Sequence, residues 1–254
     1  MRGVDRNKNM NGCLMSILSG AEYGVRLGNK DMEHIANRFA ASNYLRVAKM
    51  LASEVPGSKV LDWGCGYGQV TLLLRAVGME VEPYEIEARP NVKVISPFCD
   101  VDITYGEADK PLPYAESSFD VVLSCGTLEH VRSQDESLLE LRRVLKDDGR
   151  LYVFMLPNKH SYTELLADML HRSCHPVKFT PKTATDMLER AGFRVERIRR
   201  ANALPHNLTG LPYHIAELYG HFAGILMPLD SAISSLPLIN RFCGVIDIVT
   251  TRKP

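Results

Sequence analysis

Residues 60–68 read Val60-Leu61-Asp62-Trp63-Gly64-Cys65-Gly66-Tyr67-Gly68. The apolar start of this stretch predicts a buried strand, and the apolar residues 70–77 behind the glycines predict a helix. Glycines at such a junction let the backbone turn sharply and approach a ligand closely, while the following helix offers unpaired N–H groups to an anionic group. We therefore expect a ligand-binding loop where this strand ends.

Two common nucleotide-binding loops do not fit this stretch. The dinucleotide fingerprint G-x-G-x-x-G needs a glycine at position 69, where Gln69 stands, which argues against NAD(P). The phosphate-binding P-loop needs a following Gly-Lys-Ser/Thr, which is absent from the sequence here. Glu85, at the end of the next expected strand, has two oxygens that suit both hydroxyls of a ribose. A solvated residue at a strand end is the alternative, and the glycine loop favours the ligand interpretation.

Strands and helices alternate on both sides of the loop. Strands are expected over 59–63, 80–85, 102–105, 119–124, 151–156, 193–198 and 244–251. Helices are expected over 31–55, 70–77, 183–191 and from the capping box at Ser133 to a stop at Gly149. This order predicts an α/β fold with a doubly wound, mostly parallel seven-stranded sheet.

The alternation fails in three places. Residues 1–30 lack periodicity and are expected to be a mobile N-terminal tail, so that residues 31–254 form a single domain. Two insertions, near 157–181 and 201–240, are rich in His, Tyr and Pro. Because ligands bind at the carboxyl ends of strands in such sheets, we expect these insertions to be helical lids.

Composition excludes several classes of function. The 254 residues contain 30 basic and 30 acidic side chains, and a net charge of zero argues against nucleic acid as the main partner. No two of the six cysteines stand in a C-x-x-C spacing, so we expect reduced thiols, a cytoplasmic protein and no metal site.

Together these residues resemble the class I S-adenosylmethionine-dependent methyltransferases, particularly the branch that acts in quinone biosynthesis and on sugars and other small molecules. The resemblance covers roughly residues 58–200. The motifs that carry it are the loop 62–68, Glu85, Gly106-Glu107-Ala108 ahead of Leu112-Pro113-Tyr114, Ser118-Phe119-Asp120-Val121-Val122, Leu128-Glu129-His130-Val131 and Leu145-Lys146-Asp147-Asp148-Gly149.

The resemblance implies S-adenosyl-L-methionine as the cofactor. The residues that it assigns to cofactor binding are Asp62, Gly64, Cys65, Gly66, Gly68, Glu85, Ile86, Glu107, Ala108, Cys125, Gly126 and Leu128. Asp62 and the glycines would hold the methionine end and ribose, Glu85 the ribose hydroxyls, and Glu107 with Ala108 the adenine edge. Residues 125, 126 and 128 would line the floor beneath the sulfonium. The family commonly has aspartate at position 107, and Pro90 and Pro97 stand where it often has a regular helix.

A sulfonium methyl donor is already activated, so alignment of donor and acceptor matters most. A hydroxyl acceptor also needs a base, for which histidine has a suitable pKa. His160 follows the fifth strand and is expected to act as base, as a hydrogen-bonding partner of the substrate or as a surface residue. His175 is expected to act as base or in a structural or lid role. Glu129 and His130 are interpreted as residues that brace their loop.

The expected reaction is methyl transfer to an oxygen or nitrogen of a small-molecule acceptor, with a sugar, glycan or lipid-linked intermediate as first choice. The apolar stretch 205–240 is expected to be a helical pair over the sheet, a roof over a hydrophobic acceptor, or a helix that contacts a membrane surface. The alternatives are a catalytically silent S-adenosylmethionine-binding partner module and a dinucleotide oxidoreductase. A monomer and a homodimer are equally compatible with the sequence.

Overall fold

The computed structural model describes residues 3–89, 92–108, 110–171, 175–206, 208 and 213–253. Its α-helices are α1 (Gly3–Arg26), α2 (Glu33–Ala36), α3 (Arg38–Glu54), α4 (Gln69–Arg75), α5 (Gln134–Val144), α6 (Tyr162–Met169), α7 (Pro181–Arg190), α8 (Tyr213–His221) and α9 (Ala223–Ser234). Its strands are β1 (Lys59–Trp63), β2 (Glu80–Glu85), β3 (Thr104–Tyr105), β4 (Phe119–Cys125), β5 (Leu145–Pro157), β6 (Phe193–Ala201) and β7 (Val245–Arg252).

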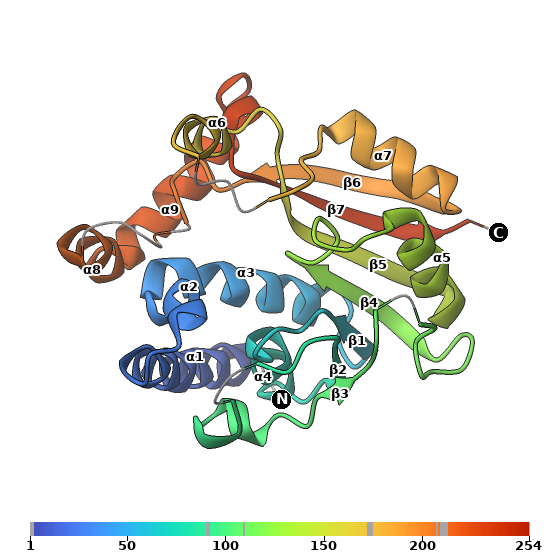
Figure 1. Ribbon diagram of the computed structural model, residues 1–254, viewed down its shortest axis with the longest axis horizontal. Coiled ribbons are helices and arrows are strands. Elements are labelled where there is room, and N and C mark those ends of the chain that lie inside the picture. The colour runs from blue at the N-terminus through green and yellow to red at the C-terminus, as the bar shows by residue number, and fades with distance from the viewer. Residues whose placement is uncertain are drawn as a thin grey trace. The chain divides into compact units, whose positions relative to one another are not determined.

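The strands form a seven-stranded sheet in the order β3-β2-β1-β4-β5-β7-β6 (Figure 1). The pairs β1–β4, β4–β5 and β2–β3 are parallel. Strand β7 is antiparallel to both β5 and β6. The predicted α/β fold with a mostly parallel seven-stranded sheet is therefore confirmed, with β7 as its antiparallel member.

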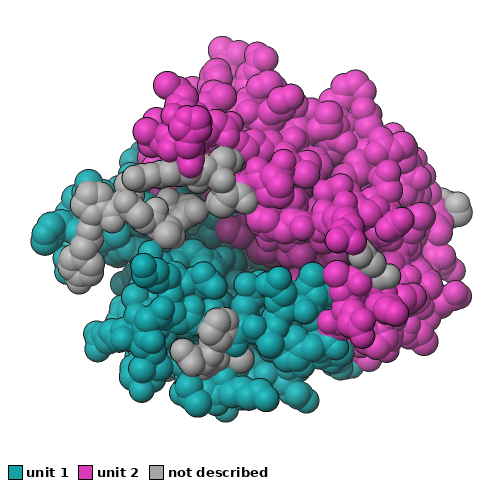
Figure 2. Space-filling model, in the orientation of Figure 1, with its two compact units in different colours: residues 1–58, 65–105, 206–229 teal, residues 59–64, 106–205, 230–254 magenta. Residues whose placement is uncertain are grey.

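The chain divides into two compact units, coloured separately in Figure 2. Unit 1 contains residues 1–58, 65–105 and 206–229, and unit 2 contains residues 59–64, 106–205 and 230–254. Neither unit is one continuous stretch of sequence. Along the sequence, the chain enters unit 2 at residue 59 and returns to unit 1 between Gly64 and Cys65, inside the glycine loop.

The structure corrects the expected N-terminal tail. Residues 3–26 form helix α1, which packs in unit 1 against α2, α3 and α4. Its buried apolar side chains recur at helical spacing and are Met10, Leu14, Ile17, Leu18 and Ala21. This spacing makes one apolar stripe, and burial of that stripe stabilises the helix. The many Asn, Gly and charged residues between these positions hid the period.

The first half of the second insertion packs on the N-terminal helices within unit 1. Asn37 caps α3 by accepting a hydrogen bond from the Phe39 N–H, and its side-chain amide donates to the Ala216 carbonyl in α8. The Phe39 ring stacks on His206 at 4.3 Å between centroids and meets Tyr219 edge-on at 5.3 Å. These contacts are with the residues that begin α3, whereas the sequence had predicted a helical pair over the sheet. Leu211, one of its apolar residues, lies outside the described residues, as does Pro90.

In unit 2, α5 begins as the sequence predicted and ends earlier than predicted. Ser133 caps the helix by accepting from the Glu136 N–H. The helix ends at Val144, because Leu145 takes an extended conformation and pairs with Phe119 in the sheet. Gly149 is therefore part of β5 and does not end the helix, which corrects the expected boundary. Among the described residues, no helix is long and apolar enough to cross a membrane.

Candidate functional site

The unit 1 part of the glycine loop is held by a buried carboxylate. Glu85, at the end of β2, is 6% exposed and accepts from the Gly66 N–H at 3.0 Å and from the Ile86 N–H at 2.8 Å. The Cys65 N–H donates to the Tyr84 carbonyl at 3.1 Å. Because each carboxylate oxygen has more than one lone pair, Glu85 retains capacity for further donors while it fixes the loop.

The two loop glycines of unit 1 are required for different reasons. Both have positive φ, +60° at Gly66 and +80° at Gly68, a region that L-residues with side chains rarely adopt. A Cβ at Gly68 would lie 2.8 Å from Val101 Cγ1, so packing excludes a side chain there. A Cβ at Gly66 would meet only the Gln69 amide, at 3.8 Å. The backbone at Gly66 is therefore open on one side, as close approach of a ligand requires.

A buried polar pair that the sequence did not suggest supports this loop. The hydroxyl of Tyr67 lies 2.9 Å from the side-chain nitrogen and 3.1 Å from the side-chain oxygen of Asn29, which follows α1. Both side chains are buried, and burial raises the pKa of Tyr67. The segment after α1, expected to belong to a tail, thus helps to fix the glycine loop.

The unit 2 part of the loop lies against the turn that follows β4. Asp62 is 2% exposed at the carboxyl end of β1. A Cβ at Gly64, where φ is +74°, would lie 2.2 Å from the Thr127 methyl group, and the Thr127 hydroxyl donates to the Gly64 carbonyl at 3.3 Å. Gly64 is therefore required by packing on Thr127, a contact that the sequence did not reveal.

The other cofactor candidates of unit 2 differ in exposure. Gly126 is exposed with φ +67°, and its N–H donates to the Phe154 carbonyl. Cys125 is half-buried, whereas Leu128 is fully buried and packs in the core. Glu107 and Ala108 are exposed in the loop after β3. The expected cofactor residues thus fall into two groups, with Cys65, Gly66, Gly68, Glu85 and Ile86 in unit 1 and the others in unit 2.

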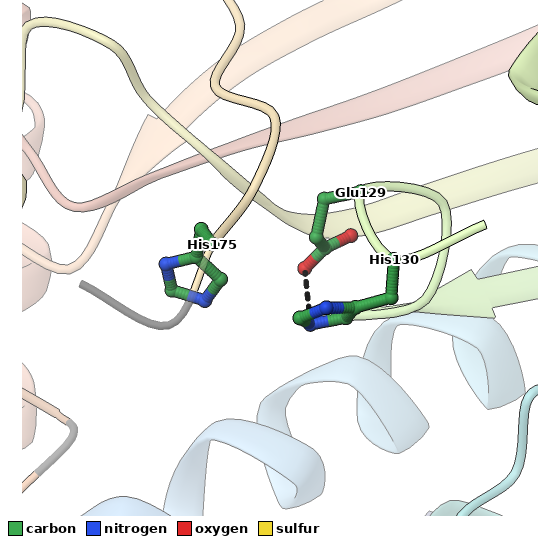
Figure 3. A group of neighbouring side chains, drawn as sticks. All are labelled: Glu129, His130 and His175. Atoms are coloured by element: carbon green, nitrogen blue, oxygen red, sulfur yellow. Dashed lines mark ion pairs between the residues drawn. The ribbon is translucent and has the colours of Figure 1, made fainter. Parts of the chain in front are cut away.

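Glu129, His130 and His175 gather in unit 2 (Figure 3). Glu129 and His130 lie in the turn after β4, and His130 Nε2 is 3.9 Å from Glu129 Oε1. His175 lies ahead of α7, with its ring centroid 5.8 Å from that of His130. Its Nδ1 is 2.9 Å from Oε1 of Glu164, in α6. We call these three residues the histidine cluster and treat Glu164 as its carboxylate support.

The pKa values of the two glutamates are shifted in opposite directions. Burial raises the pKa of Glu129 to about 7, because the charged form loses hydration. Burial is also the largest single effect on Glu164, but the hydrogen bonds and charges of His175 and Lys178 hold the pKa of Glu164 below its ordinary value. Lys178 Nζ lies 3.2 Å from Glu164 Oε2. Glu164 is therefore the ionised carboxylate that orients His175.

His160 lies on a loop whose backbone is firmly held. The preceding Asn158 is fully buried, and its side-chain amide donates to the Arg241 and Cys243 carbonyls at 3.0 and 2.8 Å. His160 itself is exposed. Of the two predicted catalytic histidines, the structure gives His175 a buried carboxylate partner and places His160 at the surface of unit 2.

Comparison with known proteins shows the family to which this chain belongs. A model of the methyltransferase domain matches residues 32–198, more than half of the chain. The chain belongs to this methyltransferase family. The resemblance to class I S-adenosylmethionine-dependent methyltransferases that the sequence suggested is thereby confirmed.

Individual relatives of this chain are moderately similar. A probable S-adenosylmethionine-dependent methyltransferase of Mycolicibacterium smegmatis is 30% identical over 59% of the chain and 57% of its own length. A ubiquinone biosynthesis O-methyltransferase of Maricaulis maris is 32% identical over 39% of the chain and 41% of its own length. The chain thus spans about half the length of these curated relatives.

A solved structure shares the fold. The 1,6-didemethyltoxoflavin-N1-methyltransferase of Burkholderia thailandensis, with 1,6-didemethyltoxoflavin and S-adenosylhomocysteine bound, superposes with a TM-score of 0.55. The two are 14% identical, and the match covers 84% of this chain and 79% of the Burkholderia chain. At this identity the similarity extends to the fold alone.

Sequence reasoning missed Glu164 although its position carried a signal. Ser161-Tyr162-Thr163-Glu164 has the pattern of a capping box, and Ser161 does accept hydrogen bonds from the N–H groups of Thr163 and Glu164. That pattern assigns the glutamate to the helix cap. The structure instead directs its carboxylate to His175 and Lys178, two residues that a local pattern does not connect with it.

Proposed function

We propose that this protein transfers a methyl group from S-adenosyl-L-methionine to an oxygen or nitrogen atom of a small-molecule acceptor. The observation that carries the proposal is the glycine loop, whose backbone is open at Gly66 and fixed by the buried Glu85. Membership in the methyltransferase family and the name of the Mycolicibacterium relative support it.

In this proposal the glycine loop and the neighbouring residues each bind a different part of the cofactor. Asp62 and Gly64, Gly66 and Gly68 hold the methionine end and the ribose, because bare backbone admits close approach. Glu85 accepts hydrogen bonds from the ribose hydroxyls with the lone pairs that the loop leaves available. Glu107 and Ala108 hold the adenine edge. Residues 65 and 86 adjoin these groups, while residues 125, 126 and 128 form the floor near the sulfonium.

The chemistry needs little beyond alignment. The acceptor atom attacks the methyl carbon in line with sulfur, the bond from methyl to sulfur breaks, and S-adenosylhomocysteine leaves. Positioning of this kind lowers a barrier by up to ~7–11 kcal/mol. Because the positive charge on sulfur disappears as the methyl leaves, exclusion of water favours the reaction. The two insertions provide the lids in this scheme.

A hydroxyl acceptor loses a proton, and two histidines are candidates to take it. His175 is the better oriented, because Glu164 accepts from its Nδ1–H and thereby leaves the Nε2 lone pair to accept a proton. His160 is the alternative, since it follows β5 on a loop that Asn158 holds in place.

Exposed apolar side chains favour an acceptor with a hydrophobic part, such as a lipid-linked sugar. In the first insertion they are Leu165, Leu166, Met169 and Leu170. In the second they include Ile215, Leu218, Ile225, Leu229 and Leu238. Unit 2 also has a cavity of about 490 Å³ lined by Lys159, Lys178 and Arg132 among others. Because Asp135 and Asp186 also line this cavity, it suits a polar part of the acceptor.

The test is transfer of a labelled methyl group from S-adenosyl-L-methionine to a panel of polar and lipid extracts. We expect a labelled small molecule and stoichiometric S-adenosylhomocysteine. His175→Ala or His160→Ala is expected to lower kcat by about 10²–10⁴-fold, whichever is the base, with little change in cofactor affinity. His214→Ala, an exposed histidine of α8, is the matched control. Cofactor binding without turnover on any acceptor would favour the silent partner module.

A further inference from the structure

The histidine cluster has the composition of a metal site. Its three residues each offer one ligand atom, and these atoms all lie within 4.8 Å of one another. Two of the residues come from the turn after β4 and the third from the segment ahead of α7, so the fold of unit 2 brings together groups that are far apart in sequence. Figure 3 shows the Glu129 carboxylate and both imidazole rings facing one region.

The carboxylate of this cluster has an unsatisfied oxygen. Glu129 is 2% exposed, and its Oε2 has no hydrogen-bond partner among the described residues. A buried polar atom without a partner destabilises a folded protein unless something binds to it. A cation beside Glu129 would remove this cost.

His175 is already oriented as metal-bound histidines usually are. Its Nδ1 is hydrogen-bonded to the carboxylate of Glu164, which Lys178 contacts in turn. When Nδ1–H donates to a carboxylate, the lone pair of the neutral ring lies on Nε2, and ligating histidines almost always have such a carboxylate or carbonyl partner. The hydrogen bond between His175 and Glu164 is a second observation, separate from the convergence of the three residues, and it also supports metal binding.

We propose that Glu129, His130 and His175 bind one divalent first-row transition-metal ion. Two imidazoles and one carboxylate suit ions such as Zn²⁺, Co²⁺ or Mn²⁺, whereas Mg²⁺ and Ca²⁺ prefer oxygen ligands throughout. In a tetrahedral site the ligand atoms lie roughly 3.3–3.5 Å apart, given bonds of about 2.0–2.1 Å. The ion therefore draws the ligands together, and the half-exposed His130 is the one with room to move.

This site goes beyond the proposed methyl transfer and does not depend on it. With the ion bound, His175 is a ligand, and His160 remains as the candidate proton acceptor. The absence of C-x-x-C spacing made a metal site unexpected, but cysteine spacing says nothing about imidazole and carboxylate ligands brought together by folding.

The test titrates the full chain, first stripped with a chelator, with Co²⁺ by absorption spectroscopy and with Zn²⁺ by calorimetry. We expect one equivalent to bind, with visible Co²⁺ bands that Zn²⁺ removes. Glu129→Gln and His175→Gln are each expected to weaken binding by at least ~10-fold. Glu164→Gln, which leaves the ligands in place, is expected to weaken it by about 10–100-fold.

Two exposed residues of the same types provide matched controls, Glu136→Gln and His214→Gln, which are expected to bind as the wild type does. Melting curves without metal show whether each variant folds. A wild type that binds no ion, variants that bind as tightly as the wild type, or tighter binding of Mg²⁺ than of Zn²⁺ would each overturn the proposal. S-adenosylhomocysteine binding, measured on the same samples, reports separately on the proposed function.

Discussion

The glycine loop and the histidine cluster present polar groups in opposite ways. In the loop, glycines leave the backbone without side chains, and one carboxylate, Glu85 from the strand that follows, accepts the Gly66 N–H. In the cluster, side chains from two separate segments converge, and among the described residues one oxygen of the Glu129 carboxylate has no hydrogen-bond partner. A loop of the first kind is suited to a ligand that contacts the backbone, and a cluster of the second kind to a compact cation.

In both regions, some residues hold the local structure in place and others are accessible. Gly64 and Gly68 are packed against Thr127 and Val101, whereas a Cβ at Gly66 would make only an ordinary contact with the Gln69 amide. Two of the three glycines therefore maintain the loop's shape and one leaves room for a ligand. In the histidine cluster, Glu164 and Lys178 maintain the position of His175, and His130 is the exposed member.

The largest effect is expected at a packed glycine. Gly64→Ala places a Cβ 2.2 Å from the Thr127 methyl group at φ +74°, and we expect the free energy of unfolding to fall by about 3 kcal/mol or more. Gly57→Ala is the matched control, because it has φ +79° with no atom within 4 Å. The measurement is denaturant unfolding. Equal losses in the two variants would show that packing on Thr127 contributes nothing.

A smaller effect is expected at the support of the loop. Tyr67→Phe removes the hydroxyl that is hydrogen-bonded to the buried side-chain amide of Asn29. We therefore expect the free energy of unfolding to fall by about 1–2 kcal/mol. Cofactor affinity should fall as well, because the loop loses its anchor. Tyr23→Phe, at a tyrosine that is 51% exposed, provides the control. If both variants keep full stability and cofactor affinity, the buried pair does not support the loop.

The smallest effect is expected at the ion pair of Glu140 and Arg143, which lies outside both regions. It serves as a reference for the contribution of an ordinary side-chain contact to stability. The hydrogen bond from Arg143 holds the pKa of Glu140 below its ordinary value, and the Leu112 N–H also donates to this carboxylate. A lowered folded-state pKa adds stability above the unfolded pKa near 4.5, and this stability is lost as pH falls through the folded value.

We therefore expect Glu140→Gln to reduce stability by about 1 kcal/mol at pH 7 and by less as the pH falls below about 4.5. Unfolding curves at several pH values measure the difference between the variant and the wild type. A difference that stays constant with pH, or that grows in acid, would contradict this assignment.

Local patterns predicted most of the fold. All seven strands were predicted near their observed positions, although β5 begins at Leu145 and not at Leu151. Ser133 was placed by its capping pattern, because this signal is local. Helix α1 was missed because its buried stripe is diluted by polar residues, and the end of α5 was misplaced because pairing of Leu145 with Phe119 overrides helix propensity.

The candidate site divides in the same way. The glycine loop and Glu85 could be predicted because backbone geometry demands particular residues at fixed spacing. The partnership of His175 with Glu164 could not, since it depends on how α6 and the segment ahead of α7 meet in space. The contact of Gly64 with Thr127 was hidden for the same reason.

The central claim is that the glycine loop binds the methyl donor through its open backbone. The most direct measurement is calorimetric titration of the wild type and Gly66→Asn with S-adenosylhomocysteine, since asparagine tolerates the φ of +60° and only fills the open side. Gly57→Asn is the control. The account predicts saturable binding to the wild type and the control and at least ~100-fold weaker binding to Gly66→Asn. No binding to the wild type, or unchanged binding to Gly66→Asn, would contradict it.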